Sequence, residues 1–227
     1  MSWFNLVVKS IGGELPFTQK SPAAMPSLEQ VCKRLFSQPA WYIKAIVGAL
    51  LLIVPVAHFF AFGYLYAMVE QARRGDALSF PEWGDWRRLF INGVAAFVIF
   101  MVLGVAPILI AWMLTYPLRL LPVNFGTFVY LPLVPTLMLA GPLSAAGLYQ
   151  HQKRGEYKDA FRLPVLIAML RSTKGYFWVP TLALIGFMVV GMPLMTFTVF
   201  TGLAASWVFY AAYFRFVEES RKSASRH

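Results

Sequence analysis

The chain has 227 residues, of which 59% are hydrophobic and only 13% are charged, and its formal net charge is +10. Soluble chains carry about 25% charged residues, so this composition excludes an ordinary soluble domain. The basic residues flank apolar runs, which a positive-inside bias explains without any role for nucleic acid. The single cysteine, Cys32, excludes an internal disulfide and any multi-cysteine metal site.

Four long stretches of the chain contain no Asp, Glu, Lys or Arg. A bilayer-spanning helix needs roughly 20 apolar residues, so three of these stretches hold one span each and the longest holds two. We therefore predict an all-α integral membrane protein with about five transmembrane helices. The four stretches are residues 45–69, 89–118, 120–152 and 175–214.

A polar, proline-interrupted segment, residues 1–40, precedes the membrane domain at 41–217. Within it, the stretch 28–36 has the amphipathic spacing of a helix that lies on a membrane surface. A loosely structured tail is the alternative. The expected apolar face comprises Val31, Leu35 and Phe36, and the expected polar face comprises Lys33 and Arg34.

The first span is predicted over about 43–69, with Pro55 and His58 near its middle. A full crossing places the N-terminus outside, although basic residues, including Lys44, stand at the mouth of the span. A re-entrant hairpin folded at Pro55 would return the N-terminus to the cytoplasm. Each arm of that hairpin would have about 11 residues, roughly 16 Å of helix, and would reach only mid-membrane. We expect the plain span and keep the hairpin as the alternative.

Two similar segments close the first and third predicted spans, GYLYAMVEQARRGD (63–76) and GLYQHQKRGE (147–156). Each contains Gly, Leu and Tyr, then a basic pair, then Gly and an acid. We interpret them as a duplicated unit of span, basic turn, surface helix and span. The predicted parts are repeat 1 (about 43–116), repeat 2 (about 128–193, ending at a turn over 191–193), a last span (about 195–217) and a basic tail (218–227).

The stretch FPEWGDWRRLF (80–90) concentrates charge between two apolar runs. Ser79 and Glu82 have capping-box spacing, and Pro81 suits a first turn, so we predict an interfacial helix that begins there. A second such helix is expected after the second basic turn. Its apolar residues are Tyr157, Phe161, Leu166 and Met169, and its polar residues are Lys158, Asp159, Arg162 and Arg171.

These two elbows form the candidate functional surface, which we expect to contact the membrane interface or a partner. Tryptophan is enriched at membrane interfaces, and Arg can face water or lipid phosphate. Fourteen of the 20 basic residues fall on the two elbows and the C-terminal tail, so we expect these parts on the cytoplasmic side of the membrane. The candidate residues are Trp83, Trp86, Arg87, Arg88, Arg73, Arg74, Lys153 and Arg154.

His58 is the one ionisable residue expected inside a span, where such residues often mark transport paths. Because no carboxylate accompanies it, a packed histidine is the simpler interpretation, and an intramembrane polar site is the alternative. No catalytic, nucleotide-binding or metal-spaced motif occurs, so we expect no enzyme activity, no cofactor and no metal. Pigment or quinone contact by the aromatic run 207–216 is an alternative to simple packing.

With these residues in view, the chain resembles an uncharacterised family of prokaryotic multi-pass membrane proteins, catalogued as a domain of unknown function. The resemblance is specific over about 41–97 and implies an architecture without an activity. The matching residues are Gly63-Tyr64-Leu65, Arg74-Gly75-Asp76, Pro81-Glu82-Trp83-Gly84-Asp85-Trp86, Leu89-Phe90 and Gly93.

The sequence therefore favours a non-enzymatic membrane protein that acts as an accessory, assembly or scaffold subunit of a larger complex. Its expected partners are the lipid bilayer and one or more proteins. The alternative is a small-molecule or lipid transporter, because many transporters are built from repeats with sites near the midplane.

Overall fold

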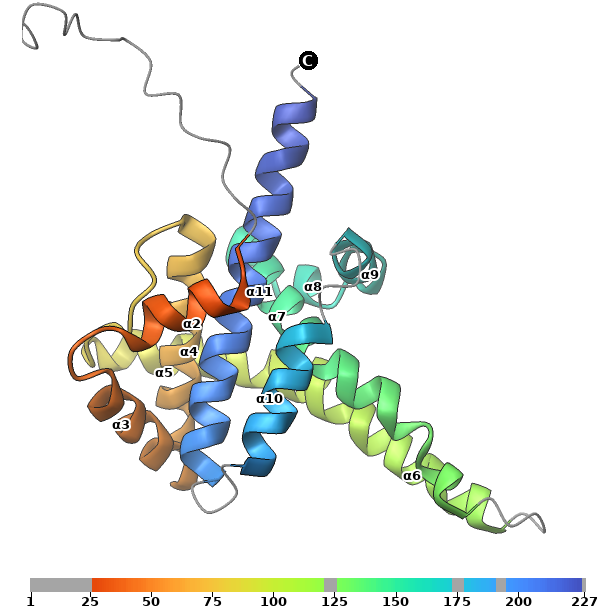
Figure 1. The fold of residues 1–227 in the computed structure, drawn as a ribbon. Helices are drawn as coiled ribbons and strands as arrows, with labels where there is room; N and C mark the ends of the chain where they lie inside the picture. The colour runs from red at the N-terminus through yellow and green to blue at the C-terminus, as the bar shows by residue number, and fades with distance from the viewer. Residues whose placement is uncertain (1–25, 121–125, 173–177, 191–194, 226–227) are drawn as a thin grey trace, which may run out of the picture.

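The computed structural model describes residues 26–120, 126–172, 178–190 and 195–225, and within these ranges the chain is all-helical (Figure 1). Three helical stretches are long and apolar enough to cross a membrane, and a fourth crossing results if α2 and α3, bent by 97°, count as one. The predicted all-α membrane class is confirmed. The three long stretches are Trp86–Leu120, Gly126–Arg154 and Met195–Ala224.

Helix α2 (Leu28–Phe36) is the amphipathic helix that the sequence predicts. It begins at Ser27, whose hydroxyl accepts a hydrogen bond from the Gln30 amide at 3.2 Å, a regular N-cap. Val31 and Leu35 are buried, while Lys33 and Arg34 are exposed. The helix therefore lays its apolar side on the bundle and turns its charges outward.

The predicted plain first span is wrong, because the chain breaks at Val54–Ala57 and folds back. Helix α3 (Trp41–Ile53) leads into the break and α4 (His58–Arg74) leads out. Near the start of α3, the Lys44 ammonium lies 2.5 Å from the Glu82 carboxylate. Residues Gln30, Val31 and Arg34 of α2 line one cavity together with Ala72 and Gly75, so the segment before α3 lies beside the end of α4. The hairpin alternative is what the structure contains.

Helix α5 (Trp86–Phe100) continues through a π-helical turn (Met101–Val105) into α6 (Ala106–Leu120). The π turn precedes Pro107, which lacks the N–H that would bond the Leu103 carbonyl and whose ring crowds that carbonyl. A widened turn relieves this conflict.

A 3₁₀ turn (Gly126–Tyr130) and α7 (Leu133–Arg154) follow. We call α6, the 3₁₀ turn and the first half of α7 the arm, because together they leave the bundle (Figure 1). Only 33% and 28% of the most apolar stretches of Trp86–Leu120 and Gly126–Arg154 are buried, against 78% for α11. Arg119 bonds the Tyr130 hydroxyl and lies 5.2 Å from the centre of its ring, which ties the two sides of the arm together.

The chain then forms α8 (Tyr157–Ala160), α9 (Leu163–Ser172), α10 (Trp178–Val190) and α11 (Met195–Ala224). Helix α11 is central and packs on α2, α3, α4, α7 and α10. The predicted turn at 191–193 lies outside the described residues, and the flanking helices run antiparallel. Helix α11 continues past residue 217, so the predicted basic tail is helical as far as Ala224.

The closest helix crossing in the bundle joins α4 and α5 through two glycines. A Cβ atom on Gly63 would stand 1.9 Å from the Leu89 carbonyl oxygen, and one on Gly93 would stand 1.7 Å from the Phe59 carbonyl oxygen. Only residues without side chains permit this backbone contact, which is a common device in membrane helix packing. The crossing fixes the chain on either side of the first elbow.

Candidate functional site: the basic end of the bundle

The two basic turns have the same local geometry. Gly75 ends α4 with φ of 81°, and Gly155 ends α7 with φ of 80°, both in the left-handed region that favours glycine. The Gly75 amide donates to the Gln71 carbonyl at 2.9 Å, and the Gly155 amide donates to the His151 carbonyl at 2.8 Å. The similarity read from the sequence therefore corresponds to a shared helix ending.

The end of α7, which carries the second basic turn, packs against α4. The Tyr66 hydroxyl of α4 is 3.4 Å from Nδ1 of His151 on α7. The side-chain amide of Gln152 donates to the Tyr66 carbonyl at 2.8 Å. Both turns also contact the same part of α11, since Arg215 lies over Gly75 and Glu218 pairs with Lys153, so the two basic turns lie toward one end of the bundle.

The C-terminal part of α11 joins the same end. The Glu218 carboxylate lies 2.7 Å from the Lys153 ammonium and 3.1 Å from that of Lys222, and it accepts a hydrogen bond from Tyr149 at 3.1 Å. Arg215 lies over Gly75, where a Cβ atom would stand 1.5 Å from a guanidinium nitrogen. Gly75 thus serves two purposes, its backbone angle and the space for Arg215.

Most of the predicted arginines are paired rather than free. Glu70 on α4 pairs with Arg74 and, at 3.1 Å, with Arg88, so one carboxylate joins α4 to the start of α5. Arg73 is half-buried, with its Nε enclosed. Arg87 is exposed and makes no ion pair with any described residue. In the first elbow, Arg87 is therefore the exposed arginine that is available to a lipid headgroup or another protein.

The predicted first interfacial helix is wrong. Ser79 and Glu82 do not cap a helix, and α5 begins only at Trp86, where the Asp85 side chain accepts a hydrogen bond from the Arg88 amide at 3.2 Å. Asp85 holds φ of 44°, a conformation that Asp tolerates better than most residues. Glu82 binds Lys44 instead, so a tertiary ion pair competes with the local cap.

The two tryptophans of this elbow have different surroundings. Trp83 stacks on Tyr64, with ring centres 4.1 Å apart, and donates through Nε1 to the Lys44 carbonyl at 3.3 Å. It is therefore half-buried against the bundle. Trp86 stacks against Trp83 at 5.9 Å and keeps 49% of its surface exposed, so Trp86 is the more open of the two to lipid or a partner.

The second elbow is helical, in two short pieces. Leu166 is buried as predicted, whereas Asp159, expected on the polar side, is only 7% exposed. It is buried between two cations, Arg154 at 3.4 Å and Arg162 at 3.1 Å. The predicted repeat unit therefore differs between its halves, with a surface helix after the second turn and an extended loop after the first.

His58 begins α4 at the break of the hairpin. Its ring lies 4.2 Å from the Phe59 ring and 4.8 Å from the Phe97 ring, measured between centres. Within the described ranges its imidazole ring makes no hydrogen bond and no ion pair, while its backbone amide donates to the Val54 carbonyl at 3.1 Å. The aromatic contacts are those of a packed histidine.

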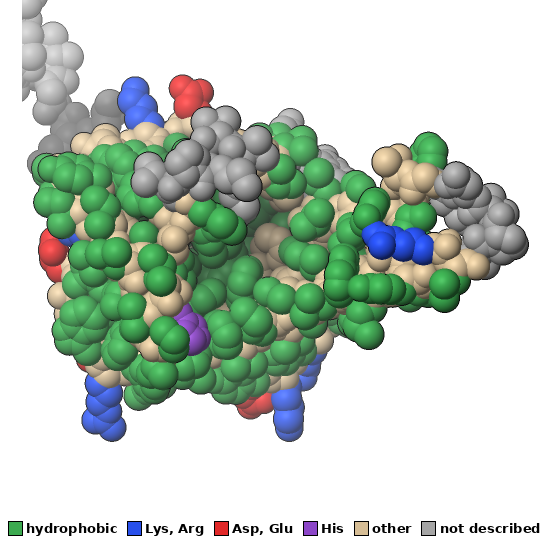
Figure 2. All heavy atoms as spheres, turned by 90° about the horizontal axis from the view of Figure 1, so that it is seen from below, with side chains coloured by type: hydrophobic (Ala, Val, Ile, Leu, Met, Phe, Trp, Pro, Cys, Tyr) green, Lys and Arg blue, Asp and Glu red, His purple; other side chains and the backbone are tan. Residues whose placement is uncertain are grey.

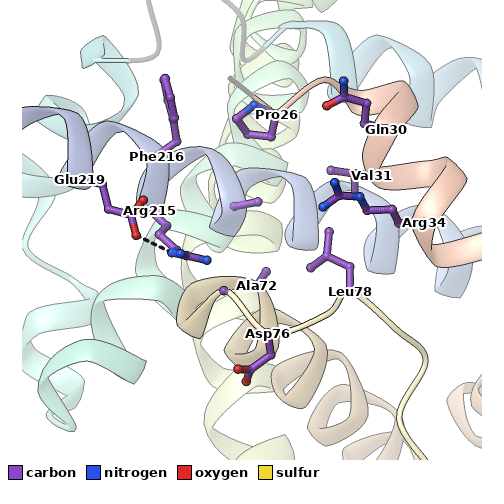
Figure 3. A pocket seen from close by; sticks show the side chains of 12 residues that line it. Pro26, Gln30, Val31, Arg34, Ala72, Asp76, Leu78, Arg215, Phe216 and Glu219 are labelled. Carbon is purple, nitrogen blue, oxygen red and sulfur yellow. Dashed lines mark hydrogen bonds and ion pairs between the residues drawn. The ribbon is translucent and has the colours of Figure 1, made fainter. Parts of the chain in front are cut away.

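Two cavities with charged walls lie at the basic end. A cavity of about 200 Å³ opens between α2, the Gly75 turn and α11, and Figure 3 shows Arg34 and Arg215 extending into it. Arg215 is held at 2.8 Å by Glu219. A larger cavity of about 410 Å³ lies along α4 and α5 and contains Glu70 with its two arginines.

The charged side chains at this end of the bundle are suited to ionic contacts. No group of three metal-binding side chains occurs in the described part of the chain. The arrangement can hold phosphate groups, carboxylates or the charged side chains of another protein through exposed guanidinium and ammonium groups.

Sequence reasoning missed the acids that organise this end, Glu70 and Glu218, and the cation Lys44. A signal for them was present, since the chain has only 10 acidic residues and isolated acids among many cations are natural ion-pair centres. Their partners come from distant parts of the chain, so spacing alone does not identify them.

The sequence profile described as "Protein of unknown function (DUF4013)" matches residues 46–200. No curated protein and no solved structure matches the chain. The match covers well over half of the 227 residues and includes the elbow signature from Gly63 to Gly93. The chain is thus a member of this uncharacterised family, as its resemblance implied.

Proposed function

We propose that the protein is a non-enzymatic docking subunit of a larger complex in a prokaryotic cytoplasmic membrane, and that the arm receives a transmembrane helix of a partner. The observation that carries this proposal is the uncovered arm. Two of the three long apolar stretches bury about a third or less of their most apolar part within the protein.

The shape and composition of the arm favour a protein over lipid alone. Figure 2 shows a hollow between the arm and the rest of the bundle. Helix α6 exposes Trp112, Met113 and Tyr116 at 47%, 65% and 54%. Aromatic residues and Met are enriched where proteins meet, and a concave apolar surface fits a helix better than mobile lipid chains.

The paired charges at the opposite end support a cytoplasmic orientation. The two basic turns and the end of α11 come together there, and basic residues favour the cytoplasmic side of a bacterial membrane. We therefore place the basic end in the cytoplasm and the hairpin break in the bilayer.

The test is gentle extraction of the full chain from native membranes, followed by mass spectrometry of the proteins that co-purify. We expect one partner in fixed stoichiometry. A variant with Trp112→Ala, Met113→Ala and Tyr116→Ala keeps an apolar helix but removes the side chains that a partner would contact, so it should lose the partner.

The matched control is Val179→Ala with Leu182→Ala, which trims two exposed apolar residues, 52% and 54% exposed, on α10. This variant should keep the partner. Isolation of the wild-type chain without any protein, or equal loss of the partner in both variants, would contradict the docking role of the arm.

A transporter or lipid-handling protein is the second candidate, favoured by one observation. The α3–α4 hairpin is a broken membrane helix with His58 at the break, and transporters use such breaks to bind substrates. A bound small molecule in the isolated chain, lost on His58→Ala, would support this function. A docking subunit should tolerate that substitution.

A further inference from the structure

The arm leaves the bundle at a level where both of its helices are interrupted. On one side, the π turn at Met101–Val105 precedes Pro107, which has no N–H to donate to the Leu103 carbonyl. On the other side, Pro142 lies inside α7 and has no N–H to donate to the Met138 carbonyl. Each helix therefore lacks a backbone hydrogen bond where the arm begins.

The two interruptions lie against each other. The π turn packs on α7, and a Cβ atom on Gly104 would stand 3.7 Å from the Ala140 carbonyl oxygen. Burial changes at the same level, since the buried residues of α7 begin at Pro142 and α6 buries only Ala111 and Thr115. The interruptions thus coincide with the boundary between bundle and arm, which we call the root of the arm.

A polar link joins the root of the arm to the centre of the bundle. The Thr181 hydroxyl on α10 donates at 3.4 Å to the Met138 carbonyl, the group that Pro142 leaves without its helical donor. The Thr181 oxygen also lies 3.0 Å from the Tyr210 hydroxyl on α11. Thr181 and Tyr210 are only 4% and 1% exposed, so the link is shielded from solvent.

The link to the Met138 carbonyl is long enough to break with a small movement. Its 3.4 Å exceeds the usual O–H···O distance of about 2.7–2.8 Å. An unpaired backbone carbonyl is costly inside a membrane, so the arm is favoured in the position that keeps Thr181 at this carbonyl. These are the properties of a hinge that is held by a weak latch.

We propose that the arm rotates on the bundle about the π turn and Pro142, and that Thr181 is the latch that sets its resting angle. The two sides of the arm move together, because Arg119 bonds the Tyr130 hydroxyl near their far ends. A rotating arm adapts to partner helices of different tilt. That use rests on the proposed docking function, whereas the motion itself does not.

The experiment measures the distance between two spin labels across the hinge by double electron–electron resonance. It uses the full chain in nanodiscs without any partner. In a Cys32→Ser background, Ile91→Cys on α5 and Leu114→Cys on α6 replace residues that are 57% and 52% exposed. Thr181→Val nearly keeps the side-chain shape and removes the donor, so the distance distribution should become about twofold wider.

A matched control and a rescue accompany this variant. The Thr136 hydroxyl donates to the Leu133 carbonyl at 2.8 Å within α7, so Thr136→Val should leave the width unchanged. Pro142→Ala restores an N–H for the Met138 carbonyl, so the double variant Pro142→Ala with Thr181→Val should be at least as narrow as wild type. A role of Thr181 in packing alone would not be rescued in this way.

A width in Thr181→Val equal to that of wild type, or a double variant as wide as Thr181→Val, would overturn the proposal. If Thr181→Val does not fold, Pro142→Ala alone decides, because it should narrow the wild-type distribution. Pro135→Ala, in the first turn of α7 where no N–H is needed, should not. Equal widths for Pro142→Ala and wild type would then contradict the hinge. No partner is present, so none of these outcomes bears on whether the arm docks one.

Discussion

The residues of the first elbow, from Gly63 to Gly93, act as one packed unit. Gly63 and Gly93 allow α4 and α5 to touch through their backbones. Between them in the sequence, the fully buried Tyr64 donates to the Pro81 carbonyl at 2.6 Å and stacks on Trp83. The signature therefore encodes a folded elbow, with the glycines setting the crossing and the aromatic rings filling it.

Gly63→Ala should destabilise the protein by about 1 to 3 kcal/mol or more, because the new methyl group meets backbone that cannot rotate away. Thermal unfolding in mild detergent would measure the loss. Gly84→Ala is the matched control within the same signature, since nothing lies within 4 Å of its Cβ position. Equal melting temperatures for the two variants would contradict the backbone-contact role of Gly63.

At the scale of the elements, the α3–α4 hairpin decides the topology. Neither helix is long enough to cross alone, since 13 and 17 residues give roughly 20 and 26 Å against a core of about 30 Å. The hairpin is closed at its mouth by Lys44, which bonds both Glu82 and the Phe80 carbonyl. Segments before and after it therefore share a side.

Single cysteines at Ser37 and at Ser225, each in a Cys32→Ser background, should react with a membrane-impermeant maleimide from the same side of the membrane. Ser37 ends α2, and Ser225 follows α11 at the basic end. Labelling in inside-out vesicles, with right-side-out vesicles as the control, should show both residues in the cytoplasm. Labelling from opposite sides would exclude the hairpin.

Glu218 on α11 binds Lys153 and Tyr149 on α7 and Lys222 on α11 itself, and we call these four residues the Glu218 cluster. Glu218→Gln weakens two ion pairs and a hydrogen bond to Tyr149, and should lower the free energy of unfolding by about 1 to 2 kcal/mol. Glu219→Gln, which removes a single i,i+4 pair with Arg215, should cost about 0.5 kcal/mol or less. Chemical denaturation measures both, and high salt should reduce the difference between them.

Whole-molecule organisation depends on α11, whose residues Trp207 and Tyr210 are among the largest fully buried side chains. A chain that stops before Met195 should fail to form a stable bundle, because α3, α4, α7 and α10 all lose their central contact. A chain that stops after Val217 loses the ion pairs of the Glu218 cluster and the Arg215–Glu219 pair, and should still fold. Protease resistance and size-exclusion profiles in detergent distinguish the two.

The sequence predicted what depends on local pattern. Uncharged stretches defined the membrane class, and the spacing around Val31 and Leu35 defined α2 within its observed bounds. The two basic turns were placed at one end by charge alone. These features depend on hydrophobic periodicity and on the distribution of charge, both of which can be determined from neighbouring residues in the sequence.

Features that depend on distant partners were not predictable in this way. The Ser79–Glu82 spacing fits a capping box, but Lys44, 38 residues away, binds Glu82 and leaves the segment non-helical. The apolar stretch 43–69, with Pro55 near its middle, is compatible with a single span and with a hairpin. Only the tertiary contact of Lys44 with Glu82 distinguishes the two. The sequence pattern placed Asp159 on the polar face of a surface helix. In the structure it is buried, and its ion pairs with Arg154 and Arg162 stabilise it there.

The central position of α11 also sets an order in time. Synthesis adds roughly 5 to 20 residues per second, so about 8 to 30 s separate the completion of α4 at Arg74 from that of α11 at Ala224. During that interval, the faces of α3, α4 and α7 that later cover α11 stand uncovered beside the insertion machinery. These faces have no protein partner until α11 is made, so the bundle closes only when α11 joins it.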